Sequence, residues 1–208
     1  MAPRLTRKEQ QARTRSTLLA SAMRVLACKG LHRASIDDIA ADAGYTKGAF
    51  YANFRSKEEL FLVLLDEHFA ERLAALERVT GGEGDIAARA REAGNDFIEA
   101  MRGDGEWCRL FLEFASHASR HEDFRAEFVA RSERLVDGVA ELLERRIAEV
   151  GVEPVIAPHT IARMTFAMAH GVAMEELLNA ENTPTDLFGE MLSVFFTGLA
   201  ARSGLPTP

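Results

Sequence analysis

Hydrophobic residues recur along most of the chain at spacings of three and four, the period of an amphipathic helix, and the strict alternation typical of strands is scarce. Glycine-rich breaks interrupt this pattern at residues 80–84 and 103–105. The pattern predicts helices over about 8–29, 36–43, 47–53, 56–79, 85–101, 106–119, 122–150, 158–180 and 184–202. We therefore expect an all-α protein of about nine helices, without internal repeats or low-complexity segments.

Two of the predicted helices are short and are joined by a tight turn. Ser35 and Thr46 stand where each would begin, and both residue types cap helix N-termini. Gly44 can adopt the left-handed conformation that ends the first helix, and Phe50 would point inward from the second. Two helices joined by a glycine-containing turn form the helix-turn-helix pattern, whose second helix enters the DNA major groove.

The next predicted helix is long and starts at a capping box. In Ser56-Lys-Glu-Glu59 the serine hydroxyl is expected to accept the Glu59 N–H, while the Glu59 carboxylate reaches back. The helix continues to about Val79, or roughly 35 Å at 1.5 Å per residue. We expect it to lead from a small N-terminal domain into a second domain.

The last two predicted helices are apolar on more than one face, so each must be covered on two sides. We expect one face to pack in the domain core and the other to contact a second subunit. The predicted interface of this homodimer consists of Phe166, Ala169, Ala173, Leu177, Leu187, Met191, Val194 and Phe195.

Charge is distributed unevenly along this acidic chain, whose net charge is −7. Residues 1–60 hold 11 Lys or Arg and 6 Asp or Glu, a net charge of +5, whereas residues 61–208 hold 14 Arg and 26 Asp or Glu, a net charge of −12. This asymmetry indicates a basic nucleic-acid-binding segment attached to an acidic body.

The cysteine and hydropathy patterns favour a soluble cytoplasmic protein. Cys28 and Cys108 are isolated, so we expect two buried free thiols and no disulfide. No apolar run approaches the roughly 18 residues of a membrane span. His117 and His121 with Glu122 have a spacing that could hold a metal, but a predicted helix junction interrupts it, and we expect no metal, no cofactor and no membrane partner.

The segment from residue 8 to residue 65 closely resembles the TetR-family transcriptional regulators. The resemblance is carried by I-A-x-x-A-G-Y-T-K-G-A-F-Y-x-N-F-x-S-K-E-E-L, which is specific as a combination. It implies a dimer of nine-helix subunits, each with a helix-turn-helix domain over residues 1–55 and a ligand-binding, dimerising domain over residues 56–208. It also implies a repressor that a small molecule releases from its operator, and not an enzyme.

The candidate DNA contacts combine this resemblance with side-chain chemistry. The Thr46 hydroxyl and the helix N-terminus can bind a phosphate, Lys47 can bind a guanine, and Gly48 permits close approach. Tyr51 and Lys57 match phosphate contacts of the family, and Asn53 stands where the family often has His. The predicted set is Arg4, Arg7, Ser35, Tyr45, Thr46, Lys47, Gly48, Tyr51, Asn53 and Lys57.

Aromatic and methionine side chains in the predicted second domain could line a largely apolar effector pocket that holds a few polar groups. The same residue types also make ordinary cores, so the pocket is a hypothesis. Its predicted lining is Asn95, Phe97, Met101, Trp107, Phe111, Phe114, His117, Phe128, Met164, Met168 and His170, with Glu113 as a further polar candidate.

Two alternatives remain at this stage. The first is a constitutive DNA-binding regulator whose second domain binds a protein partner. The second is an enzyme with a helix-turn-helix domain, but the sequence has no glycine-rich phosphate loop, nucleophile elbow or H-E-x-x-H pattern.

Overall fold

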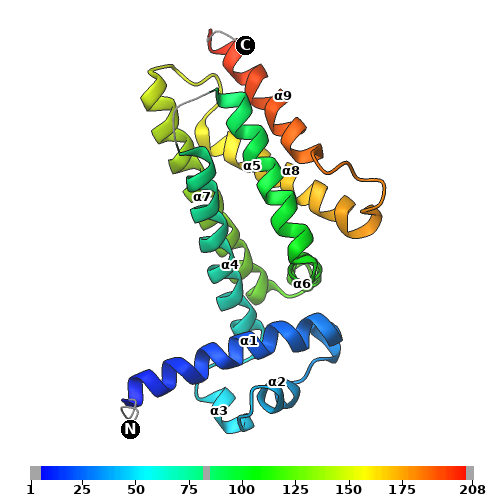
Figure 1. Cartoon of the computed structure of the whole chain (residues 1–208). Coiled ribbons are helices and arrows are strands. Elements are labelled where there is room, and N and C mark those ends of the chain that lie inside the picture. Colours follow the sequence, from blue (N-terminus) through cyan, green and yellow to red (C-terminus); the bar gives the residue numbers. More distant parts are fainter. Residues whose placement is uncertain (1–5, 82–84, 205–208) are drawn as a thin grey trace, which may run out of the picture. The chain divides into compact units, whose positions relative to one another are not determined.

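The computed structural model describes residues 6–81 and 85–204. Within them α-helices joined by turns and short loops make up the chain, and there is no strand. The all-α prediction is confirmed (Figure 1). The helices are α1 (Arg7–Arg33), α2 (Ile36–Asp42), α3 (Lys47–Tyr51), α4 (Lys57–Thr80), α5 (Ile86–Gly103), α6 (Gly105–Ala118), α7 (Glu122–Val150), α8 (Pro158–Asn179) and α9 (Leu187–Arg202).

The chain divides into two compact units that differ from the predicted domains. Unit 1 comprises the described residues of Met1–Glu67 together with Arg109–Phe128, and unit 2 comprises those of His68–Cys108 and Val129–Pro208. The second half of α6 and the start of α7 therefore group with the helix-turn-helix segment. The functional boundary at residues 55 and 56 stays a prediction.

Side-chain caps fix several helix starts where the sequence predicts them. The Thr46 hydroxyl accepts the Ala49 N–H at 3.2 Å, and the Ser35 hydroxyl accepts the Asp38 N–H at 3.0 Å. The Ser56 hydroxyl likewise accepts the Glu59 N–H at 3.1 Å. The Glu59 carboxylate, however, accepts the N–H of Arg55 at 2.6 Å, one residue earlier than a capping box requires.

Helix α1 contains a break at Gly30, where the prediction ends the helix. Gly30 has φ 74° and ψ 167°, a conformation that is essentially restricted to glycine. The chain then makes one more turn, which closes with the Ala34 N–H donating to the Gly30 carbonyl at 3.1 Å. This turn leads directly into the cap of α2 at Ser35.

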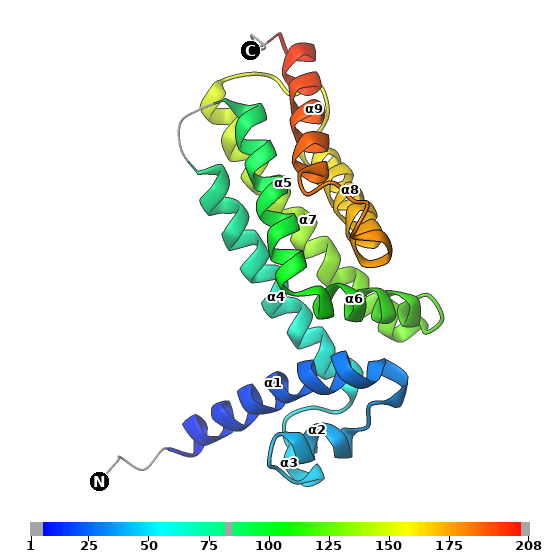
Figure 2. The same cartoon turned by 45° about the vertical axis from the view of Figure 1, so that its right-hand side comes forward.

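The core of unit 1 joins α2 and α3 to α1, and Figures 1 and 2 show these three helices together. Leu18, Ile39 and Phe50 are completely buried. The buried Ser21 hydroxyl lies 2.8 Å from both the Ile39 carbonyl and the Asp42 carboxylate, so a polar contact also links α1 to α2.

In unit 2, α5 and α9 run along each other at very close range (Figure 2). Gly94 and Gly189 face each other at this crossing, and a Cβ atom on Gly94 would lie 2.6 Å from the Gly189 nitrogen. Arg91 of α5 pairs with Glu190 of α9 beside it. The two glycines therefore permit an approach that any side chain would prevent.

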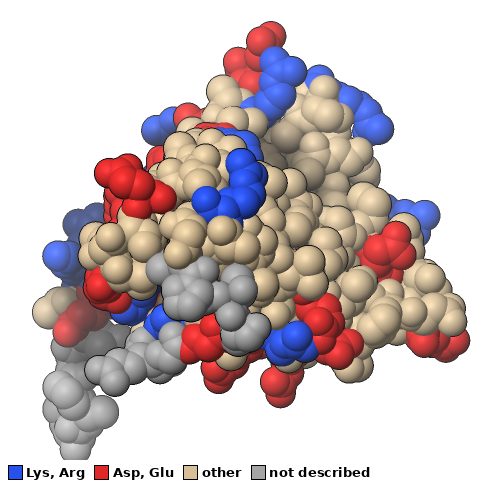
Figure 3. All heavy atoms as spheres, turned by 90° about the horizontal axis from the view of Figure 1, so that it is seen from above, with Lys and Arg blue, Asp and Glu red and all other residues tan. Residues whose placement is uncertain are grey.

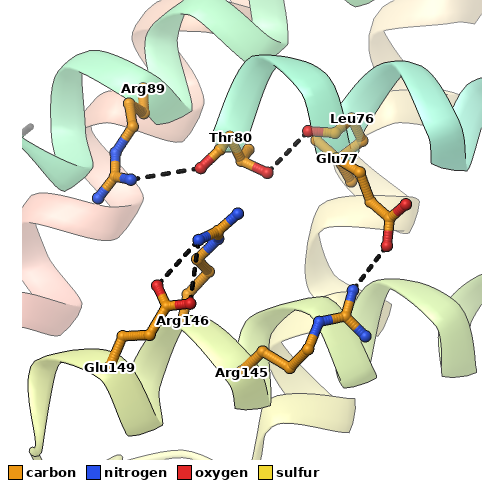
Figure 4. Close-up of polar contacts among 7 residues, drawn as sticks. All are labelled: Leu76, Glu77, Thr80, Arg89, Arg145, Arg146 and Glu149. Carbon is orange, nitrogen blue, oxygen red and sulfur yellow. Dashed lines mark hydrogen bonds and ion pairs between the residues drawn. The ribbon is translucent and has the colours of Figure 1, made fainter. Parts of the chain in front are cut away.

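Polar contacts surround the end of α4 in unit 2 (Figure 4). Glu77 pairs with Arg145 of α7 at 2.6 Å, and Arg89 of α5 donates to the Thr80 carbonyl at 3.3 Å. The Thr80 hydroxyl donates to the Leu76 carbonyl at 2.7 Å. Exposed ion pairs contribute little stability, so these contacts mainly set how α4 ends.

None of the described helices combines the length and the apolar character that crossing a lipid bilayer would require.

Candidate nucleic-acid interface

The turn between α2 and α3 has the geometry of a helix-turn-helix. Gly44 has φ 72°, and the Tyr45 N–H donates to the Ala40 carbonyl at 2.8 Å. Helix α3 follows at once from its cap at Thr46. Phe50 is buried, whereas its neighbour Tyr51 is 52% exposed, so α3 presents its outer face to solvent.

Most of the predicted DNA contacts are accessible. The exposed ones are Arg7, Ser35, Thr46, Lys47, Gly48 and Tyr51. Tyr45, Asn53 and Lys57 are partly buried, and Arg4 lies outside the described residues. The accessible residues come from the start of α1, the cap of α2, and the cap and outer face of α3, which therefore form the candidate interface.

Lys47 is held toward α2 by an ion pair. Its ammonium lies 2.9 Å from the Asp37 carboxylate, and this hydrogen bond raises the pKa of Lys47. The Lys47 side chain is 52% exposed and that of Asp37 is 65% exposed, so water screens the ion pair. Lys47 can therefore exchange Asp37 for a phosphate or a base. Lys47 is therefore charged and accessible at the start of α3.

The other two carboxylates of α2 are neutralised from α1. Asp38 pairs with Lys29 at 2.7 Å, and the pairing lowers the pKa of Asp38 well below its usual range. Asp42 pairs with Arg24 at 2.5 Å, and its hydrogen bonds with Ser21 and Arg24 lower the pKa of Asp42. The acidic residues of α2 therefore do not leave a negative surface beside α3.

Two of the predicted contacts also have structural tasks. The Asn53 amide donates to the Ala49 carbonyl at 2.8 Å. The Lys57 ammonium donates to the carbonyls of Leu31 and Ala34 at 2.8 and 2.7 Å. Both side chains therefore hold the helix-turn-helix together, whatever they contribute to DNA contact.

Sequence reasoning missed Arg15 of α1. Its guanidinium donates to the Asn53 carbonyl at 3.0 Å and lies 4.3 Å from the centre of the Phe54 ring. Arg15 is not among the predicted contacts. Its contact partners are 38 residues away in the sequence, and helical periodicity carries no information about such a contact.

The predicted effector-pocket residues are divided between the two units. Phe111, Phe114, His117 and Phe128 belong to unit 1, and the other seven belong to unit 2. Phe114 is completely buried, with its ring stacked on that of Phe61 at 3.4 Å between centres. Within unit 1, Phe114 therefore acts as a core residue joining α6 to α4.

In unit 2, three of the predicted residues gather at one place. Phe97, Met101 and Met168 are partly buried and pack against a core cluster that includes Val172 and Phe188. Asn95 and Met164, in contrast, are exposed. The residues that come together are flexible or aromatic and come from α5 and α8, so they form the candidate effector region of this unit.

Two histidines of unit 2 are held neutral by burial. His68 stacks on Trp107 at 4.1 Å between ring centres, and burial lowers the pKa of His68 to about 4. Burial also lowers the pKa of His170, whose Nδ1 atom lies 2.8 Å from the Phe166 carbonyl. Both imidazoles can therefore serve as neutral polar groups at pH 7.

The predicted dimer face differs from the face that α8 leaves exposed. Ala173 is 9% exposed, and Phe166 packs against a core cluster that includes Val136. The exposed apolar and small residues of α8 follow helical spacing at Met164, Ala167, Gly171, Met174 and Leu178, and Leu178 is 77% exposed. On α9, Val194 is 71% exposed, whereas Leu187, Met191 and Phe195 are partly buried, as are Ala169 and Leu177 of α8. Figure 3 shows one face of the molecule with Lys, Arg, Asp and Glu side chains scattered among uncharged residues.

The two cysteines have different surroundings. Cys108 is buried as predicted, lies 3.5 Å from the Ala173 carbonyl, and has its pKa raised by burial. Cys28 is exposed, so the prediction that it is buried is wrong. It lies near the end of α1, two residues before Gly30.

The described part of the chain contains no group of three or more His, Cys, Asp or Glu side chains able to hold a metal ion. The His117 and His121 rings stack at 3.9 Å between centres, with helix α6 ending between them at Ala118. The two imidazoles therefore contact each other.

Comparison with known proteins finds matches along most of the chain. The model for bacterial regulatory proteins of the tetR family matches residues 18–64, and the model for the C-terminal region of BetI-type transcriptional repressors matches residues 86–201. The chain is 30% identical over 142 residues to the HTH-type transcriptional activator FasR of Mycolicibacterium smegmatis, and this match covers 68% of the chain and 62% of FasR.

Solved structures share the fold at low sequence identity. The transcriptional regulator FadR from Bacillus subtilis, in complex with stearoyl-CoA, has a TM-score of 0.70 at 15% identity, covering 86% of this chain and 96% of FadR. A protein from Saccharomonospora viridis, in complex with choline, has a TM-score of 0.64 at 19% identity, covering 89% of this chain and 96% of that one.

The buried imidazole of His68 makes stability depend on pH. An unfolded histidine takes up a proton near pH 6.5, whereas the pKa of about 4 keeps folded His68 neutral. Its contribution to stability should therefore fall between about pH 6.5 and 4, by about 3 kcal/mol in total. Urea unfolding of the wild type and of His68→Phe, which keeps a ring beside Trp107, measures this at several pH values. An equal loss of stability in both proteins would contradict the assignment to His68.

Proposed function

The chain belongs to the tetR family of bacterial regulatory proteins, and we propose that it is a repressor which binds a pseudo-palindromic operator as a homodimer and is released by a small, largely apolar molecule. DNA binding and transcriptional regulation are properties of the family. The repressing direction, the two-fold operator and the effector are the proposed parts.

The accessible face of α3 is the observation that supports the DNA-binding mode. Thr46 ends the turn, Lys47 is charged and exposed in the first turn of the helix, and Tyr51 is exposed one turn later. A lysine can bind the O6 and N7 acceptors of guanine in the major groove, and a tyrosine hydroxyl can donate to a phosphate. We propose that α3 reads bases while Arg7, Ser35 and Tyr45 contact the backbone or the minor groove.

The exposed apolar stripe of α8 supports the homodimer. Met164, Met174 and Leu178 lie on one face at helical spacing, with the small residues Ala167 and Gly171 between them. A stripe of this kind marks an interaction site, and small residues allow two helices to approach closely. Together with Val194 of α9 it offers a self-complementary surface for a two-fold dimer.

The cluster of Phe97, Met101 and Met168 supports an apolar effector. These side chains are only partly buried in unit 2, and Met is able to repack around a bound hydrophobic group. The neutral imidazoles of His68 and His170 add polar groups without charge. The stearoyl-CoA bound to the FadR structure makes an acyl chain a suitable first probe.

Selection from a randomised duplex library tests operator binding. The wild-type protein should enrich a pseudo-palindrome whose half-sites lie about 34–36 Å apart, and its affinity should fall steeply with salt. Lys47→Ala should weaken binding about tenfold and relax the sequence preference at the base pair that Lys47 contacts. Arg145→Ala, which removes the same charge from α7 in unit 2, is the control. Enrichment of no sequence would refute this part of the proposal.

A charge placed in the apolar stripe tests the dimer. Leu178→Asp should give a monomer at micromolar concentration in analytical ultracentrifugation, because the interface would bury an unpaired carboxylate. Val155→Asp places the same charge at an exposed apolar position that precedes α8 and should leave the dimer intact. A dimer in both variants would exclude this face.

Titration of the protein–operator complex tests the effector class. Stearoyl-CoA should release the selected duplex at micromolar concentration, and Phe97→Leu should raise the concentration required, because it removes an aromatic ring from the cluster. Choline, a small cation, should have no effect. Release by choline would contradict an apolar effector, and a complex that resists both probes would favour a constitutive regulator with a protein partner.

A further inference from the structure

The short turn after the break in α1 is the link that leads into α2. It comprises residues 31–34 and is immediately followed by Ser35, the cap of α2. Because Gly30 interrupts the helix, the first N–H of the turn lacks the carbonyl four residues back that would normally accept it. The last carbonyls of the turn have no following helical residues to pair with. The turn therefore needs partners from outside α1.

Glu113 of α6 supplies the acceptor at the start of this turn. Its carboxylate oxygen accepts the Leu31 N–H at 2.6 Å, across 82 residues of sequence. Both carboxylate oxygens would lie 3.2 Å from a Cβ atom on residue 30, so the absence of a side chain at Gly30 lets Glu113 approach. A charged acceptor makes this a stronger hydrogen bond than one between neutral groups.

Lys57 of α4 supplies the donor for the carbonyls of the first and last residues of the turn. Its ammonium donates to the Leu31 and Ala34 carbonyls at 2.8 and 2.7 Å. The turn is thus bound by a carboxylate at its free N–H and by an ammonium at its free carbonyls. We call these contacts of Glu113 and Lys57 the turn clamp.

The α6 side of the turn clamp is itself held in place. Phe114, the residue after Glu113, is completely buried and stacks on Phe61 of α4. His117, one turn further along α6, lies edge-on to His32 of the clamped turn at 6.3 Å between ring centres. All these residues belong to unit 1, so Glu113 is fixed relative to the helix-turn-helix.

We infer that Glu113 is a positioning residue for operator recognition: through the turn clamp it sets how α2, and with it α3, is presented to DNA. This inference rests on the proposed function. Glu113 has no place among the DNA contacts, and its negative charge would oppose a phosphate. Its loss should therefore affect the alignment of α3 with bases, and leave the sequence-independent attraction to phosphates unchanged.

The test compares the affinity of the full-length protein for its selected duplex with that for a scrambled duplex at one salt concentration. Glu113→Ala should weaken selected-duplex binding about tenfold and leave scrambled-duplex binding within twofold. Glu113→Gln, whose amide oxygen can still accept the Leu31 N–H, should keep most of the wild-type ratio between the affinities for the selected and the scrambled duplex. Glu106→Ala makes the same change in the first turn of α6 and should keep the wild-type ratio.

Amide hydrogen exchange reports the clamp directly. The Leu31 amide should exchange at least tenfold faster in Glu113→Ala than in the wild type or in Glu106→Ala. If Glu113→Ala does not fold, Glu113→Asp, which keeps the charge but shortens the side chain, should show the same loss of discrimination.

Three outcomes would overturn the inference. A folded variant with an unchanged affinity ratio shows that Glu113 does not position α3. An equal loss for both duplexes shows a general loss of folded protein. If the wild-type protein enriches no duplex, the proposed function fails and this inference fails with it. If the wild-type protein enriches a duplex but the Glu113 variants keep the wild-type ratio of the two affinities, only this inference is overturned.

Discussion

A helix as short as α3 depends on tertiary packing. It has five residues, and isolated helices below about 12 residues are marginal in water. The burial of Phe50, at 0% exposure, anchors α3 to α1 and α2, while the Thr46 cap satisfies one of its free N–H groups. Every outward-facing residue of α3 owes its position to this packing, so the hydrophobic core of unit 1 is a condition for recognition.

The same dependence applies to the segment that presents α2. The break at Gly30 leaves polar backbone groups without helical partners, and burying such groups unpaired would cost free energy. Charged side chains from α4 and α6 pair with them. The grouping of Arg109–Phe128 with the helix-turn-helix in unit 1 has this physical basis, along with the stacking of Phe114 on Phe61.

The sequence predicts best the features that depend on neighbouring residues. The caps at Ser35 and Thr46 and the left-handed Gly44 follow from local rules, and the structure confirms them. The contacts of Glu113 with Leu31 and of Arg15 with Asn53 join residues far apart in the sequence, and no local pattern indicates them. The sequence analysis names Glu113 as a polar group of an effector pocket. An acidic residue among aromatic ones suits that role as well as it suits the observed contact with Leu31.

Helix α8 shows why an apolar pattern on two faces does not tell which face the core of the subunit covers. When nearly every turn carries apolar residues on two sides, periodicity cannot tell which side the core of the same subunit takes. The structure packs Val172 and Ala173 inward and leaves Met174 and Leu178 exposed. The exposed face is therefore displaced from the predicted face by one residue, or about 100° around the helix axis. The small residues Ala167 and Gly171 then lie in the middle of the exposed stripe, where the proposed close approach of a second copy would need them. The apolar stripe that α8 leaves exposed therefore adjoins the predicted face, and the predicted residues themselves are mostly taken up by packing within the subunit.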